Sequence, residues 1–147
     1  MKKFFLASIV ALAMGFAFVS CNQSNAPVDI KTDGTPEEVL TDIVAKAKAE
    51  GANWSIDQWK YVYKQAAIAV KPMLLEIAEL TKEENMTADN IDEVMEKLGK
   101  LETQYKPIDK LMNEFSEIAK GIPNGKIVDD DKDFEKQMKE ELGLPDL

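Results

Sequence analysis

Four acidic residues near the C-terminus have a spacing that could bind a metal ion. Asp129, Asp131 and Asp133 match the first, third and fifth positions of a twelve-residue calcium loop, and Glu140 matches the twelfth. The sixth position of such a loop needs glycine for its sharp turn, and Phe134 occupies it here. We interpret these acids as residues near the start of a helix, where the helix dipole favours negative charge. They are the candidate metal ligands of the chain, and the sequence predicts that they hold no metal.

The residue types that are missing exclude most catalytic sites. The chain has no histidine and one cysteine, and every basic residue is lysine. Histidine-based triads, histidine metal ligands, Glu-x-x-His di-iron sites and His/Met haem sites are therefore excluded. A single cysteine also excludes disulfides and thiolate zinc sites. Neither a glycine-rich phosphate loop nor a G-x-S-x-G motif occurs. We expect no cofactor.

Acid–base chemistry would have to use carboxylates alone. Such a site needs one of two carboxylates in an apolar cleft, so that its pKa is shifted. The candidate pairs all lie off the apolar stripes and among lysines, which is typical of a solvated helix face. They are Glu76/Glu79, Glu93/Glu96 and Glu114/Glu117. We therefore predict that the protein is not an enzyme.

The one cysteine stands at the end of an apolar N-terminal segment. Lys2 and Lys3 are followed by an uncharged apolar run over 4–19 and by the small Ser20, which precedes Cys21. A positive start, an apolar run and a small residue are typical of an export signal. The run of 16 residues is shorter than the roughly 20 that a membrane span needs.

The last four residues of this segment, Phe18-Val19-Ser20-Cys21, resemble the lipobox of bacterial lipoproteins. The resemblance implies that signal peptidase II cuts before Cys21 and that this residue carries a diacylglycerol and an N-acyl chain. The family prefers leucine where this chain has Phe18. Several acyl chains give stable membrane attachment, whereas one gives only marginal binding. Asn22, where Gram-negative inner-membrane lipoproteins often have aspartate, favours the outer membrane, with the domain in the periplasm or at the cell surface.

The mature chain is strongly acidic. The full sequence has 18 basic and 27 acidic residues, and loss of Lys2 and Lys3 with the signal leaves 16 − 27 = −11. Such a charge repels phosphate backbones, so we expect no nucleic-acid partner. It also repels anionic headgroups, so the acyl chains on Cys21 must hold the protein to its membrane.

Composition divides the chain into three parts. Residues 1–20 form the signal peptide, and residues 21–34 are predicted to be the lipidated cysteine and a flexible polar tether that contains Pro27 and Gly34. The remaining residues, 35–147, are predicted to form one helical domain.

A capping box predicts where this domain begins. Thr35 and Glu38 have the Thr-x-x-Glu spacing, and Pro36 stands at the first helical position. A single apolar stripe follows. We expect a helix over about 36–50 that ends at Gly51.

The second helix has a similar start. Ser55 and Gln58 form another capping box, and the apolar spacing then continues through Pro72. This pattern predicts a kinked helix over about 56–83. Its apolar positions alternate by three and four as in a heptad seam: Ile56, Trp59, Tyr63, Ala66, Val70, Met73, Ile77 and Leu80.

A third helix is expected from a cap at Asp89 or Asn90 to Gly121, with a kink at Pro107. Its apolar positions repeat the three-four spacing: Ile91, Val94, Leu98, Leu101, Tyr105, Ile108, Met112, Phe115 and Ala119. A Pro-Asn-Gly sequence predicts a loop over 122–130. A short helix over about 131–142 completes the domain.

The predicted fold class is all-α. Two long helices joined by a short turn must lie antiparallel, so the pattern indicates a four-helix bundle built on a long kinked antiparallel helical hairpin. The aromatic residues near the start of the second helix could form a recognition patch, but core packing is favoured. They are Trp54, Trp59, Tyr61 and Tyr63. Trp59 and Tyr63 lie on the seam, and Trp54 can pack onto Trp59 across the first turn. Tyr61 alone lies off the stripe.

These observations favour a lipid-anchored cell-envelope protein with a non-enzymatic binding or assembly role and a protein partner in the envelope. Two alternatives keep the same fold. One is a small-ligand carrier with a cavity near the kinks at Pro72 and Pro107. The other is an inhibitor or immunity protein for a basic envelope enzyme, since the charge of −11 would steer a cationic partner.

Overall fold

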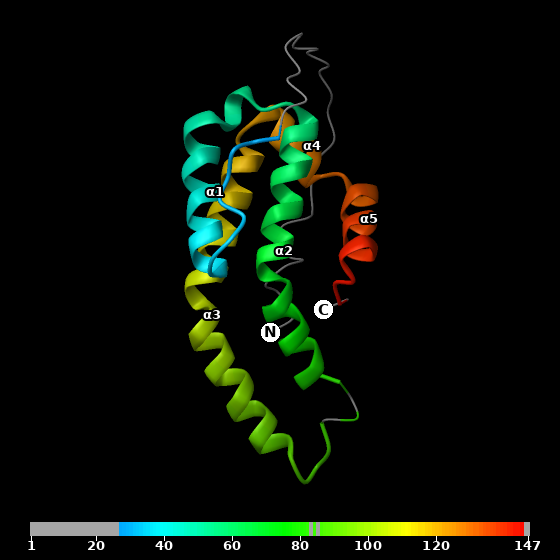
Figure 1. Ribbon diagram of the computed structural model, residues 1–147. Helices are drawn as coiled ribbons and strands as arrows, with labels where there is room; N and C mark the ends of the chain where they lie inside the picture. The colour runs from blue at the N-terminus through cyan, green and yellow to red at the C-terminus, as the bar shows by residue number, and fades with distance from the viewer. Residues whose placement is uncertain (1–26, 83, 85, 146–147) are drawn as a thin grey trace.

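The computed structural model describes residues 27–82, 84 and 86–145, and this part of the chain is all-helical (Figure 1). The predicted signal peptide and Cys21 lie outside the described residues. Within them, no helix has the length and apolar character needed to cross a membrane. The helices are α1 Pro36–Glu50, the 3₁₀ helix η1 Gly51–Asn53, α2 Ile56–Leu80, α3 Ile91–Lys120, α4 Pro123–Asp129 and α5 Lys132–Leu142.

Both predicted capping boxes are confirmed. At the start of α1 the backbone N–H of Glu38 donates to Thr35 Oγ1 (3.2 Å), and the Thr35 N–H donates to Glu38 Oε2 (3.1 Å). At the start of α2 Ser55 and Gln58 exchange the same two bonds at 3.2 and 2.9 Å. Each box satisfies backbone donors that a helix leaves unpaired at its N-terminus.

The core lies at one end of the hairpin. α1 packs mainly against α3 and also contacts α2, and α4 closes the end of this group. Helix α4 contributes Val128 to the same buried cluster. The largest fully buried side chains all come from α1, α2 and α3: Trp59, Phe115, Leu40, Ile43, Val62 and Val70.

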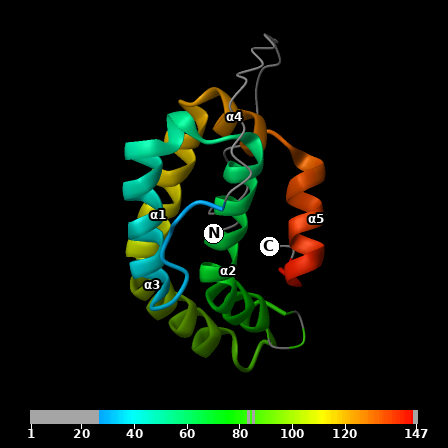
Figure 2. The ribbon, with the colours of Figure 1, turned by 45° about the horizontal axis from the view of Figure 1, so that its top comes forward.

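The other half of the hairpin extends beyond this core. We call residues 78–104 the distal arm; they comprise the end of α2, the connection and the first half of α3. None of the described residues of the distal arm belongs to the main buried cluster, although Val94 and Leu101 are buried. In Figures 1 and 2 the arm projects past the ends of α1 and α5. The apolar pattern thus predicted two long helices correctly, but only the proximal parts of both enter the main core.

The segment 27–34, which we expected to belong to a flexible tether, packs along α1 instead. Val28 and Ile30 are buried in the main core, at 7% and 8% exposure. They alternate with the exposed Asp29 and Lys31, as in an extended chain with one face buried. Pro27, Gly34 and the polar residues around them suggested a linker. The two-residue alternation of apolar and polar residues was the sequence signal that indicated a packed, extended segment instead.

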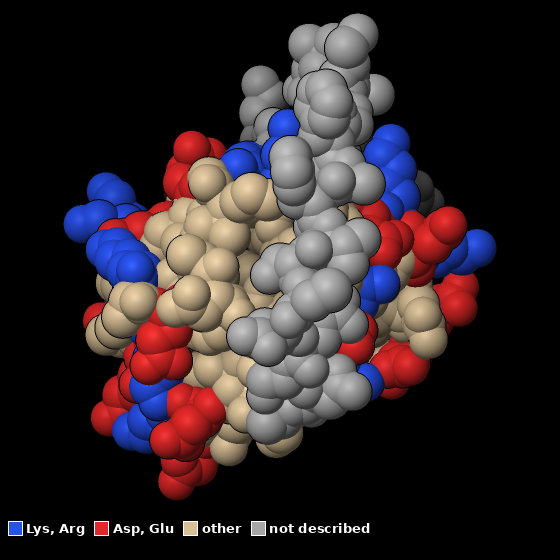
Figure 3. All heavy atoms as spheres, turned by 90° about the horizontal axis from the view of Figure 1, so that it is seen from above, with Lys and Arg blue, Asp and Glu red and all other residues tan. Residues whose placement is uncertain are grey.

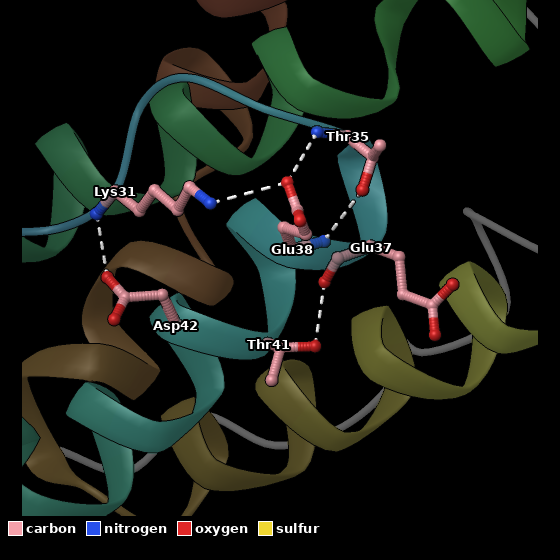
Figure 4. Close-up of polar contacts among 6 residues, drawn as sticks. All are labelled: Lys31, Thr35, Glu37, Glu38, Thr41 and Asp42. Atoms are coloured by element: carbon pink, nitrogen blue, oxygen red, sulfur yellow. Dashed lines mark hydrogen bonds and ion pairs between the residues drawn. The ribbon is translucent and has the colours of Figure 1, made fainter.

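Polar contacts fix the direction of this segment. The Lys31 N–H donates to Asp42 Oδ2 (2.7 Å), and Lys31 Nζ lies 3.3 Å from Glu38 Oε2 (Figure 4). Farther along α1, Lys46 donates to the carbonyl of Asp29. The segment therefore runs antiparallel to α1, and its first described residues lie beside the C-terminal half of that helix.

The expected loop over 122–130 is wrong, because residues 123–129 form α4. Pro123 stands in the first turn of this helix, where proline is well tolerated. Gly125 disfavours a helix in isolation, but a Cβ atom there would lie 2.7 Å from the carbonyl oxygen of Ala119. Close packing on the end of α3 therefore requires glycine at this position.

The segment 27–34 gives a direct test of its packing. Ile30→Ala should lower the free energy of unfolding by about 2–4 kcal/mol, the usual cost of truncating a buried isoleucine. Thr32→Ala, at an exposed position of the same segment, should change it by less than about 0.5 kcal/mol. Urea unfolding followed by circular dichroism measures both. Equal, near-zero effects would show that the segment is a free tether.

Candidate functional site

The acids of the calcium-loop pattern are directed to different partners. Asp131 Oδ1 accepts from the Phe134 N–H (2.9 Å) and so caps α5, while its Oδ2 lies 2.9 Å from Lys60 Nζ. Glu140 lies 3.9 Å from Lys136, and Asp133 is exposed in the first turn of α5. Across residues 27–82, 84 and 86–145, no group of three or more acidic or other ligand side chains is placed to hold a metal ion.

Asp129 belongs to a polar contact that joins three helices. Its Oδ1 accepts from the hydroxyl of Tyr63 in α2 (2.7 Å) and from the hydroxyl of Ser116 in α3 (3.5 Å). Burial raises the pKa of Asp129, and it outweighs the opposing effect of the bond from Tyr63. Burial, followed by the charge of Asp129, also raises the pKa of Tyr63. This contact ties α4 to the hairpin.

Aromatic rings enclose this contact. The ring of Tyr63 lies 4.8 Å from that of Phe115 and 6.3 Å from that of Trp59, measured between centroids. Trp54 meets Trp59 edge-on at 4.9 Å, which confirms the predicted packing of these two rings across the first turn of α2. Tyr61 also packs against the core. Trp54, Trp59 and Tyr63 thus pack in or against the core, as predicted, whereas the spacing of Tyr61 did not indicate its core contact.

The glutamate pairs lie on lysine-bearing helix faces. Neighbouring lysines lower the pKa of Glu93 and of Glu114, in each case through a hydrogen bond and a favourable charge. Tyr105 donates to Glu76 at 2.7 Å, and this bond raises the pKa of Tyr105 to about 12. The ion pairs of this group are Glu79–Lys82, Glu93–Lys97, Glu96–Lys100, Glu114–Lys48 and Glu117–Lys120.

An uncharged stripe on the distal arm contrasts with these faces. Ile91, Met95 and Gly99 follow one another at four-residue spacing, so they share one face of α3. We call these three residues the α3 stripe. Met95 is 52% exposed and Ile91 is 37% exposed. A Cβ atom at Gly99 would meet nothing within 4 Å. The stripe is therefore open along its length.

The connection before α3 adds another apolar side chain to this region. Met86 is exposed, and the turn that follows is closed by the Asn90 N–H donating to the Thr87 carbonyl (3.2 Å). Methionine adapts its shape to different partners, which makes it frequent on binding surfaces. The seam pattern assigned Ile91 to the core and passed over Met95. The sequence signal for this exposed stripe was Met95, an apolar residue off the seam, followed four residues later by Gly99 inside a helix.

Comparisons of the chain with known protein families, with curated proteins and with solved structures found no match.

The two helical glycines should respond in opposite directions to the same change. Gly99→Ala should raise the free energy of unfolding by about 0.5–1 kcal/mol, because alanine favours the helix and its methyl group meets no neighbour. Gly125→Ala should lower it, because its methyl group would strike the Ala119 carbonyl. Urea unfolding measures both variants. Destabilisation by Gly99→Ala would show that this face of α3 is not open.

Asp129 should make stability depend on pH. Because burial raises its pKa in the folded protein, ionisation of this carboxyl opposes folding as the pH rises. Asp129→Asn retains an oxygen that accepts from Tyr63 and removes the charge. We expect the variant to be more stable than the parent at about pH 7, with the difference vanishing below about pH 4. Urea unfolding across this range measures it. If the parent protein were instead more stable than Asp129→Asn at neutral pH, the prediction would be wrong.

Proposed function

We propose that this chain is a lipid-anchored envelope protein that presents its distal arm to a protein partner and acts by binding, without turnover. The observation that carries the proposal is the exposed α3 stripe, with Met86 before it, on an arm that lies outside the main core. The export signal and the lipobox resemblance support attachment through Cys21. Asn22 favours the outer membrane.

The fold suits this role. We interpret α1, α2, α3 and the pair α4–α5 as the members of a four-helix bundle built on the α2–α3 hairpin. Pro72 and Pro107 lie inside α2 and α3, where proline removes a backbone hydrogen bond and favours a bend. The proximal half of the hairpin gives the bundle its core. The distal half gives it a helical surface that the rest of the described chain leaves open.

The side chains of the arm fit a protein partner. An exposed apolar strip bordered by charged side chains is typical of a helix surface that binds another protein. The ion pairs Glu93–Lys97 and Glu96–Lys100 lie on the same stretch of α3 and supply the polar surroundings. Gly99 would let a partner approach the helix backbone closely. The partner is then another protein of the cell envelope, reached in the periplasm or at the cell surface.

Site-specific cross-linking in native membranes tests the proposal. A photoreactive amino acid at position 95 should give a discrete cross-linked product, whereas the same group at position 136, on the exposed face of α5, should give none. Ile91→Glu should reduce the product at position 95 about tenfold or more, as expected for a central contact residue. Identical patterns at positions 95 and 136, or a product that Ile91→Glu leaves unchanged, would contradict the proposal.

A further inference from the structure

The end of the molecule opposite the distal arm carries an uncharged surface. Helix α4 lies across this end, and its buried residues Gly125 and Val128 face the core. Pro123 and Ile127, four residues apart, therefore face outward, and Ile127 is 52% exposed. The exposed Ala52 of η1 lies in the element that contacts α4. We call Ala52, Asn53, Pro123 and Ile127 the end surface.

Charged residues surround this end. Neither η1 nor the first turn of α4 contains an acidic residue, although 27 of the 147 residues of the chain are acidic. Figure 3 looks onto this end and shows an area of uncharged residues to the left of the grey atoms, with Lys, Asp and Glu along its margins. Glu50 and Lys126 are exposed beside the end surface and carry opposite charges. An acidic protein thus has one end where its own charge is low.

The described chain begins at the same end. Asp29 accepts a hydrogen bond from Lys46, which lies about one turn before the end of α1, and η1 follows that helix directly. In Figure 1 the first described residues lie at the height of α4, whereas the connection between α2 and α3 is at the opposite extreme. The packing of segment 27–34 on α1 fixes this arrangement.

The length of chain before this point limits how far the domain can stand from its membrane. Five residues, 22–26, separate Cys21 from Pro27. Fully extended, the chain from Cys21 to Pro27 spans about 20 Å. A tether over 22–34 would have reached about twice as far. A lipid on Cys21 would therefore hold this end close to the bilayer, while α3, about 45 Å long, carries the arm away from it.

We infer that the end surface rests on the lipid bilayer to which Cys21 is attached. The inference depends on the lipid anchor of the proposed function and adds the orientation of the domain. Anionic headgroups repel an acidic protein, so its uncharged end is the surface that approaches them at least electrostatic cost. Contact between Ile127 and the bilayer surface is weak alone. The lipid anchor holds the domain next to the bilayer, which makes this contact intramolecular and raises its effective concentration. The distal arm then points away from the membrane.

Spin labels at two matched positions test this orientation. Ile127 and Met95 have the same exposure, 52%, and lie on the end surface and on the arm respectively. The acylated full-length mature protein, with a labelled cysteine at either position, is bound to vesicles of phosphatidylethanolamine and phosphatidylglycerol. Collision rates with a water-soluble nickel chelate and with oxygen, which concentrates in lipid, are then measured. We expect the label at 127 to be several-fold less accessible to nickel, and more accessible to oxygen, than the label at 95.

A label at Ala52→Cys gives a second report, and adding Ile127→Glu should abolish its protection while the protein stays on the vesicles. Equal nickel accessibility at positions 127 and 95, in protein that floats with the vesicles, would overturn the membrane contact and leave the anchor intact. Protein that does not float with the vesicles would overturn the anchor and the orientation together. Loss of binding through the distal arm would affect neither result, because no partner protein is present.

Discussion

The burial of Trp59 is the constraint on which the rest of the structure depends. Its indole is fully buried, and its Nε1 donates to the carbonyl of Gly51 at 3.2 Å. The ring lies 5.9 Å from Phe115, between centroids, and so joins α2 to α3. A Cβ atom at Gly51 or at Gly125 would lie 3.0–3.1 Å from this ring. The backbones of η1 and α4 therefore approach the indole so closely that glycine is favoured at both positions. One side chain therefore organises four elements at one end of the hairpin.

This one-ended core explains how the two surfaces are separated. Short α1 and α4 cover only the proximal part of the hairpin, so the distal arm lies beyond their reach. The buried residues Val28 and Ile30 bring the start of the described chain to the covered end. In our account a lipid on Cys21 therefore attaches the protein at the end that Trp59 closes. The apolar stripe that includes Met95 lies at the other end.

Local chemistry made much of this predictable from the sequence. The boxes at Thr35 and Ser55 act over three residues, so the starts of α1 and α2 followed directly. Helix α4 was missed because Gly125 opposes a helix locally, and only contact with the Ala119 carbonyl requires glycine there. The packing of residues 27–34 on α1 was missed because Pro27, Gly34 and the polar residues around them outweighed the short two-residue period of Val28 and Ile30. The exposed stripe was missed because only Ile91 of its three residues lies on the seam. The seam residues Val94 and Leu101 are buried, whereas Met95 and Gly99 lie off the seam and are exposed. The site of lipid attachment, Cys21, remains a prediction from sequence.

The central claim is that the protein is attached at one end through Cys21, and intact mass spectrometry of the mature protein from native membranes tests it most directly. The account predicts a chain that starts at Cys21, lacks residues 1–20 and carries the added mass of a diacylglycerol and an N-acyl chain. A chain that begins with an unmodified Cys21, or one that retains residues 1–20 without added lipid mass, would contradict it.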